Sequence, residues 1–237
     1  MTKIENILRT TETKALKACL GIKNGTTSDI IYAEINRPDI ISTLQDRQYN
    51  FRMKIENLKK DEALMKEVWD ICDQQDKDNL CQYYRNLQCN NAISNLNNRK
   101  SNIQLSDQTM NVRYRSMIGF TSPAILYDSC LDDKLRTIIT RWRLSSHKLR
   151  IETGRYTNPK ILRVNRLCKI CAIIEDEHHA IYHCRAHTTI RRNYQKDLDL
   201  QNDDIASLLN PLTISNAISL AAFLNEIENN MKVLDMT

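Results

Sequence analysis

Three cysteines and a histidine stand close together in the C-terminal half of the chain, as Cys168, Cys171, His179 and Cys184. Their spacing is C-x2-C-x7-H-x4-C. Thiolate sulfur and imidazole nitrogen are ligands that zinc prefers, and four of them complete its tetrahedron. Because four protein ligands leave no position for water, the spacing predicts a structural zinc ion and not a catalytic one.

The last two ligands have more than one assignment, because His178, His179 and His183 share one short stretch. His179 and His183 are four residues apart and would share a helix face, so a Cys2His2 site is an alternative. His179 and Cys184 are five apart, about 140° around an ideal helix, so that pair needs a helix that begins late or bends. No H-E-x-x-H arrangement is present, which disfavours a zinc hydrolase.

The remaining cysteines are expected to be packing residues with reduced thiols. The N-terminus has charged residues where a signal peptide has an apolar run. No stretch approaches the ~18 apolar residues of a membrane span. We therefore expect a protein inside the cell, in the nucleus or cytoplasm, without a membrane partner. The five cysteines outside the metal motif are Cys19, Cys72, Cys81, Cys89 and Cys130.

The composition favours helices over strands. The 237 residues include only four Gly and four Pro, and aromatic residues make up 6%. A sandwich or barrel needs more turn residues and more aromatic and β-branched strand formers. The predicted fold is mainly α: a helical module followed by a basic helix and a small zinc knuckle.

Apolar residues at helical spacing predict N-terminal helices over 4–19, 41–58, 64–72 and 80–87, with Gly21 as a helix stop. Thr26 and Asp29 have the spacing of a capping box and predict a short helix over 26–36. Seven of the 17 residues from Asn86 to Asn102 are asparagine, which disfavours regular helix. We therefore predict a helical module over 1–90 and a linker-like segment over 91–127. A third part, 128–237, would hold the basic helix, the knuckle (166–190) and a last helix after Pro211.

The positive charge is concentrated between Lys134 and Arg166. This window has ten basic residues and a single acid, Glu152, whereas the whole chain carries only +5. A local excess of this kind is typical of a nucleic-acid-binding surface. The residues assigned to that surface are Lys134, Arg136, Arg141, Arg143, Lys148, Arg150, Arg155, Arg163 and Arg166.

Residues 128–149 are predicted to form one helix whose apolar stripe docks on the core. The cations flank that stripe in two rows and would face outward, although a solvated helix face is the alternative. The stripe consists of Leu131, Leu135, Ile138, Trp142 and Leu149. One row is Lys134, Arg141 and Lys148, and the other is Arg136, Arg143 and Arg150.

The motifs together resemble the C-terminal, post-polymerase region of non-LTR retrotransposon reverse transcriptases, in particular jockey-like elements. The resemblance is carried by the run from Arg141 to Tyr156, by Arg166-Leu-Cys168-Lys-Ile-Cys171 and by the segment Glu175 to Cys184. Leu20-Gly-Ile and Tyr32-Ala-Glu34 add to it more weakly. The resemblance implies His179 and Cys184 as the last two ligands. His178 departs from it, because the family usually has an apolar or aromatic residue there.

The resemblance also implies contact with RNA or DNA, and a polymerase part in a parent protein. Polymerase activity does not carry over, because the family's catalytic carboxylates lie in a palm domain. Asp132-Asp133 and Asp203-Asp204 are expected to begin helices, where acids favour the dipole. We therefore expect a zinc-stabilised nucleic-acid-binding region and not an enzyme. The alternative is an independent zinc-stabilised protein that binds an acidic protein.

Overall fold

The computed structural model describes residues 3–23, 25–58, 92–105, 114, 124–127 and 131–236, and these are mainly helical, as predicted. Within these ranges the structure has no β-strand, and Leu167 and Ile174 form an isolated antiparallel bridge. None of the described helices is long and apolar enough to cross a membrane. The helices predicted at 64–72 and 80–87 lie outside the described residues.

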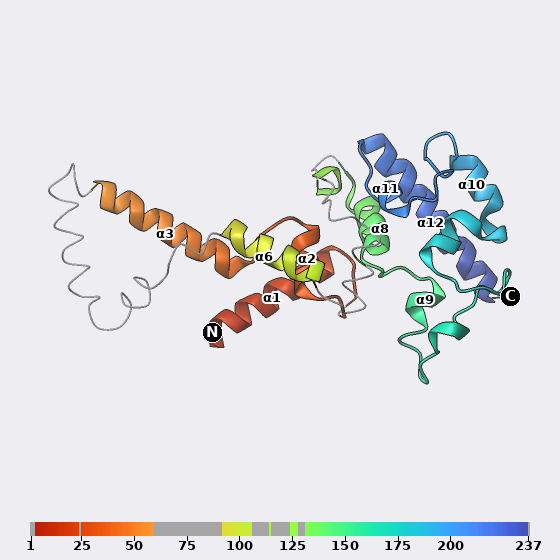
Figure 1. Ribbon diagram of the computed structural model, residues 1–237, viewed down its shortest axis with the longest axis horizontal. Coiled ribbons are helices and arrows are strands. Elements are labelled where there is room, and N and C mark those ends of the chain that lie inside the picture. Colours follow the sequence, from red (N-terminus) through yellow and green to blue (C-terminus); the bar gives the residue numbers. More distant parts are fainter. Residues whose placement is uncertain are drawn as a thin grey trace.

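The N-terminal helices gather at one end of the molecule, the red-to-yellow part of Figure 1. They are α1 (Lys3–Cys19), α2 (Ser28–Glu34), α3 (Ile40–Leu58) and α6 (Ala92–Leu105). The last five residues of α2 are buried. Gly21 follows α1 with φ +63°, and a Cβ there would lie 2.5 Å from a methyl of Thr137, so glycine suits this stop for two reasons. Cys19 is exposed, contrary to the packing role expected for it.

The asparagine-rich segment differs from the linker that we predicted, because residues 92–105 form helix α6. Ala92, Leu96 and Ile103 are buried, and α6 packs against α2 and α3. Arg99 forms ion pairs with Asp29 and Asp39, which fixes the helix on the module. The apolar positions and this ion pairing outweigh the low helix propensity of asparagine, a common tertiary override. Cys72, Cys81, Cys89 and Cys130 lie outside the described residues.

The C-terminal half is built around α12 (Ile214–Met236), which packs against α8 (Asp133–Arg143) and α10 (Thr188–Tyr194). Short helices lie between these: η1 (Ala124–Tyr127), α9 (Arg150–Thr153), η2 (Arg163–Asn165), η3 (His179–His183), η4 (Arg185–His187) and α11 (Ile205–Leu208). Trp142 and Phe223 are fully buried in this core. In Figure 1, α8 lies between the N-terminal helices and the cluster of α9, α10 and α12.

The prediction of one helix over 128–149 is wrong, because α8 ends at Arg143. Ser145 adopts φ +51°, and Ser146 donates its backbone N–H to Arg141 at 2.6 Å, which turns the chain away from the helix axis. Leu131 and Leu149 are buried as predicted, but they lie outside α8 and reach the core from the flanking turns. Asp132 caps α8 and Asp204 caps α11, so both acid pairs stand at helix starts as expected.

Candidate metal centre

The first two cysteines lie on a tight hairpin. The Leu167–Ile174 bridge closes it, and the backbone N–H of Cys168 donates to Ile173 at 2.8 Å. Ala172 donates its N–H to the Cys168 carbonyl at 2.9 Å and adopts φ +57°. This left-handed residue makes the reversal that places two thiols three positions apart on one side of a turn.

The histidine and the last cysteine are aligned by a π-helical turn, η3 (His179–His183). The backbone N–H of Cys184 donates to the His179 carbonyl at 2.7 Å, an i to i+5 bond. A turn closed by such a bond is wider than an α-helical turn, so residues five apart lie on one face. In an ideal α-helix His179 and Cys184 would point about 140° apart, and the π turn brings them to the same side.

The structure brings Cys168, Cys171, His179 and Cys184 together, with one ligand atom from each within 4.8 Å of the others. The sulfurs of Cys168 and Cys184 are 3.8 Å apart. Cys168, His179 and Cys184 are buried, and neither ring nitrogen of His179 has a hydrogen-bond partner. His183 instead lies beside Asp203, about half exposed, so the geometry does not favour the Cys2His2 alternative.

The electrostatics of this group follow from its burial. Burial raises the pKa of the Cys184 thiol to about 12, and the nearby sulfurs of Cys168 and Cys171 raise it further. Burial also lowers the pKa of His179, with Asp176 acting in the opposite direction, so the imidazole is neutral. The Nη1 atom of Arg191 is buried without a hydrogen-bond partner, and the thiolate forms of Cys184 and Cys171 would favour its positive charge.

A buried polar network fixes the hairpin and the π turn to the end of α8. His147 Nε2 lies 2.5 Å from Glu177 Oε1, and Ser145 Oγ lies 3.3 Å from the same oxygen. The backbone N–H of Leu149 lies 3.3 Å from His147 Nδ1, so the ring is held on both sides, by Leu149 and by Glu177. The His147 ring also stacks at a tilt on Trp142, with 4.9 Å between ring centres.

Glu175 ties a second segment to the hairpin. Its carboxylate accepts the backbone N–H of Arg150 at 2.8 Å, and its backbone pairs with Ile151 and Arg166. Glu152 is equally buried, with its Oε1 3.2 Å from Arg155 Nη1 and its Oε2 3.9 Å from Lys23 Nζ. The sequence analysis assigned no structural role to Glu152 and Glu175. The one feature that could have pointed to them is that both lie in the segments that carry the resemblance.

The cations predicted to bind nucleic acid are mostly engaged within the protein. Arg143 is fully buried, and its Nε donates to Glu34 at 2.6 Å, so its predicted outward position is wrong. The reason is that Glu34, Leu209 and Asn210 converge on it from distant parts of the chain. Lys134 and Arg163 are exposed. The other pairs are Arg136 with Asp133, Arg141 and Lys148 with Glu228, Arg150 with Glu175, Arg155 with Glu152, and Arg166 with the carbonyls of Ile151 and Ile161.

Comparison with known proteins adds no relative: no family model matches the chain, and neither a curated protein nor a solved structure matches it significantly.

Proposed function

We propose that Cys168, Cys171, His179 and Cys184 bind one structural zinc ion. The observation that carries this proposal is the pair of unpartnered nitrogens on the buried His179 ring, which faces three cysteines. A buried polar group without a partner is costly, and zinc ligation satisfies one of these nitrogens. A zinc ion with three thiolates and one imidazole carries a net charge of about −1. Arg191 supplies the compensating charge.

Zinc would join two elements, each of which is shaped by its own local hydrogen bonds. The hairpin contributes Cys168 and Cys171, and the π turn contributes His179 and Cys184. In so small a unit, zinc-binding energy is folding energy. The ion is therefore expected to stabilise the surface formed by the hairpin and the chain that leads into it.

We further propose that this surface binds nucleic acid, and that the chain is the C-terminal region of a retrotransposon-type reverse transcriptase without its catalytic core. Residues 153–174 include five basic residues and no acid. Lys160, Arg163 and Lys169 are exposed there. The cations of α8 are mostly engaged in ion pairs. We therefore assign nucleic-acid binding to this loop and the hairpin, and not to the flanks of the helix.

The salt dependence of binding tests this proposal. In the zinc-loaded protein, Lys160→Gln together with Arg163→Gln should weaken binding to fluorescently labelled RNA and duplex DNA of every sequence. Two lost phosphate contacts should flatten the log–log salt slope by about 1.4 for single strands and about 1.8 for duplex DNA. Fluorescence anisotropy at several salt concentrations measures the slope.

The matched control is Lys14→Gln with Arg47→Gln, which removes the same charge from exposed positions on α1 and α3. The control should keep the wild-type slope. Equal slopes in wild type, variant and control would contradict a nucleic-acid role for the loop.

The second candidate function is binding of an acidic protein. The same loop exposes the large apolar side chains of Ile161, Leu162 and Val164, which are 40%, 70% and 66% exposed. Exposed apolar residues that alternate with cations along the chain suit a protein interface as well as a nucleic acid. A wild-type chain that binds neither RNA nor DNA at low salt would favour this alternative.

A further inference from the structure

Two histidines and an aspartate form a second cluster beside the proposed zinc site. The Oδ2 atom of Asp203 lies 3.4 Å from His183 Nε2 and 3.9 Å from His178 Nε2. One ligand atom from each residue lies within 4.8 Å of the other two. All three side chains are about half exposed, so the cluster is open to solvent, unlike the buried cysteines.

The π turn that aligns His179 with Cys184 also aligns His178 with His183. Both pairs are five residues apart, and i to i+5 geometry places such residues on one face. The two pairs are shifted by one residue, so they occupy neighbouring faces. The rings of His178 and His183 have centres 4.9 Å apart, and the Tyr182 ring lies 5.3 Å from that of His178. One turn thus presents a ligand pair inward and another outward.

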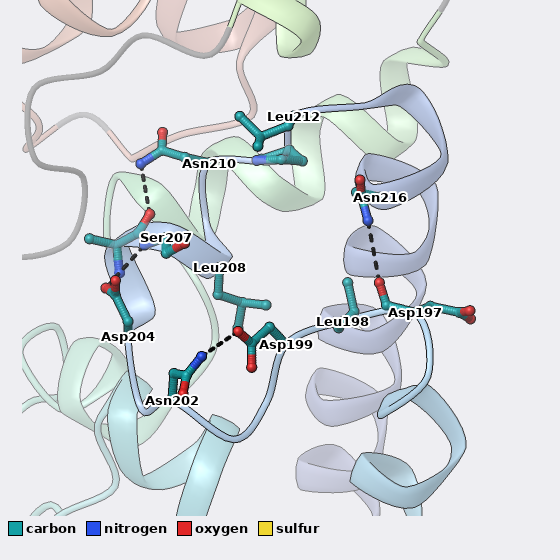
Figure 2. Close-up of a pocket in the computed structure, with 12 residues that line it drawn as sticks. Asp197, Leu198, Asp199, Asn202, Asp204, Ser207, Leu208, Asn210, Leu212 and Asn216 are labelled. Atoms are coloured by element: carbon teal, nitrogen blue, oxygen red, sulfur yellow. Dashed lines mark hydrogen bonds between the residues drawn. The ribbon is translucent and has the colours of Figure 1, made fainter.

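The loop that supplies Asp203 is held by its own hydrogen bonds. Figure 2 shows Asn202 donating to Asp199, at 2.5 Å, and Asp204 accepting the backbone N–H groups at the start of α11. These residues line a pocket of about 510 Å³ between the loop and α12. Asp203 lies between the two anchored residues with φ +52°, a conformation uncommon outside glycine. The loop therefore holds the carboxylate in place opposite the histidines.

We propose that His178, His183 and Asp203 form a second, solvent-open site for a divalent transition metal, with zinc the best fit. Imidazole nitrogen and carboxylate oxygen are both zinc ligands. Two atoms each about 2.0–2.1 Å from a tetrahedral ion are about 3.4 Å apart, close to the His183–Asp203 separation. Three protein ligands leave at least one position for water or an anionic oxygen. The bound ion would link the π turn to the loop that precedes α11.

The number of ions bound per chain tests the proposal. The wild-type protein should bind two Co²⁺ or Zn²⁺ ions in equilibrium dialysis. Only the cysteine site gives the intense near-ultraviolet absorption of cobalt bound to thiolate. Asp203→Asn and His183→Ala should each weaken the second ion at least ~10-fold and leave the thiolate absorption unchanged.

The control is Asp197→Asn, which removes an exposed carboxylate from the same loop but not from the cluster. It should retain both ions. Because Asp203 is on a different segment from the cysteines, its variant separates loss of the second site from damage to the π turn. A wild-type chain that binds one ion, or a second ion held equally by Asp203→Asn and Asp197→Asn, would overturn the proposal. Thiolate absorption reports the cysteine site separately, so failure of one site is distinguishable from failure of the other.

Discussion

Glu34→Gln is expected to destabilise the protein strongly, because Glu34 and Arg143 form a fully buried ion pair. Arg143 donates to the two carboxylate oxygens at 2.6 and 3.1 Å. The hydroxyls of Tyr114 and Tyr127 donate to the same carboxylate, each at 3.0 Å. The amide keeps the shape of the side chain but removes the negative charge that the buried guanidinium faces.

Breaking a buried pair by neutralising one partner costs about 3–5 kcal/mol, a large part of the ~5–15 kcal/mol by which a domain is stable. At a urea dependence near 3 kcal/mol per molar, the unfolding midpoint should fall by about 1–2 M. Circular dichroism of the zinc-saturated protein during urea titration measures this midpoint. Arg143 keeps hydrogen bonds to Leu209 and Asn210, so the fold should persist in the absence of urea.

Two further variants separate the ion pair from general effects of substitution. Glu226→Gln changes an exposed carboxylate that accepts a hydrogen bond from Tyr194, and should alter stability by less than about 0.5 kcal/mol. Replacing Glu34 and Arg143 together with Met should cost less than the sum of the two single changes. If Glu34→Gln lowered the unfolding free energy no more than Glu226→Gln, or if the Glu34 and Arg143 changes were additive, the buried ion pair would not be a major source of stability.

The remaining predictions concern the metal and the acid limit of stability. X-ray absorption at one equivalent of zinc should show three sulfur ligands to one nitrogen, and a two-to-two ratio would contradict the assignment of Cys184. Asp39 is buried, which raises its pKa, but Ser42, Arg9 and Arg99 lower it by a larger amount. The folded pKa thus lies below the unfolded value of about 3.9, so its stabilisation holds above that pH and is lost as pH falls further. Asp39→Asn should flatten the fall in melting temperature below about pH 4, and an unchanged pH profile would contradict this.

Properties that depend on local sequence were predictable. The mainly helical fold, helix α3 and the C-terminal helix follow from apolar spacing and from the scarcity of Gly and Pro. Cys168 and Cys171 could be paired from spacing alone because a tight turn suffices to bring them together. The same local reasoning placed Asp132 and Asp204 at helix starts, where the structure has them as caps.

Properties that depend on distant partners were not predictable from spacing. The helix predicted over 128–149 placed Arg143 on its outward side. Nothing near Arg143 in the sequence identifies Glu34, 109 residues away, as its partner. Asn-rich 92–105 is helical because Arg99 and the buried Ile103 bind it to the N-terminal module. The choice between His183 and Cys184 depended on a π turn, which the 3.6-residue period of an α-helix does not anticipate.

The residues on which we based the predicted resemblance to reverse transcriptases differ in physical role from the loop before the hairpin. Ser145, His147, Glu152, Glu175 and Glu177 are all at most 5% exposed and hydrogen-bond within the protein. These residues fix the hairpin to the end of α8. Any protein with this packing would require them, whichever partner it binds. The exposed cations and apolar residues of the loop before the hairpin are free of this packing and are placed to contact a partner. A Glu177 variant would therefore lose binding through unfolding under either proposed function, whereas Lys160→Gln with Arg163→Gln changes the charge of the loop and leaves that packing intact. The salt dependence of binding by this double variant is therefore compared with that of the Lys14/Arg47 control. A flatter slope in the double variant alone indicates a nucleic-acid-binding loop, whereas equal slopes indicate that the chain shares only the packing of such a region.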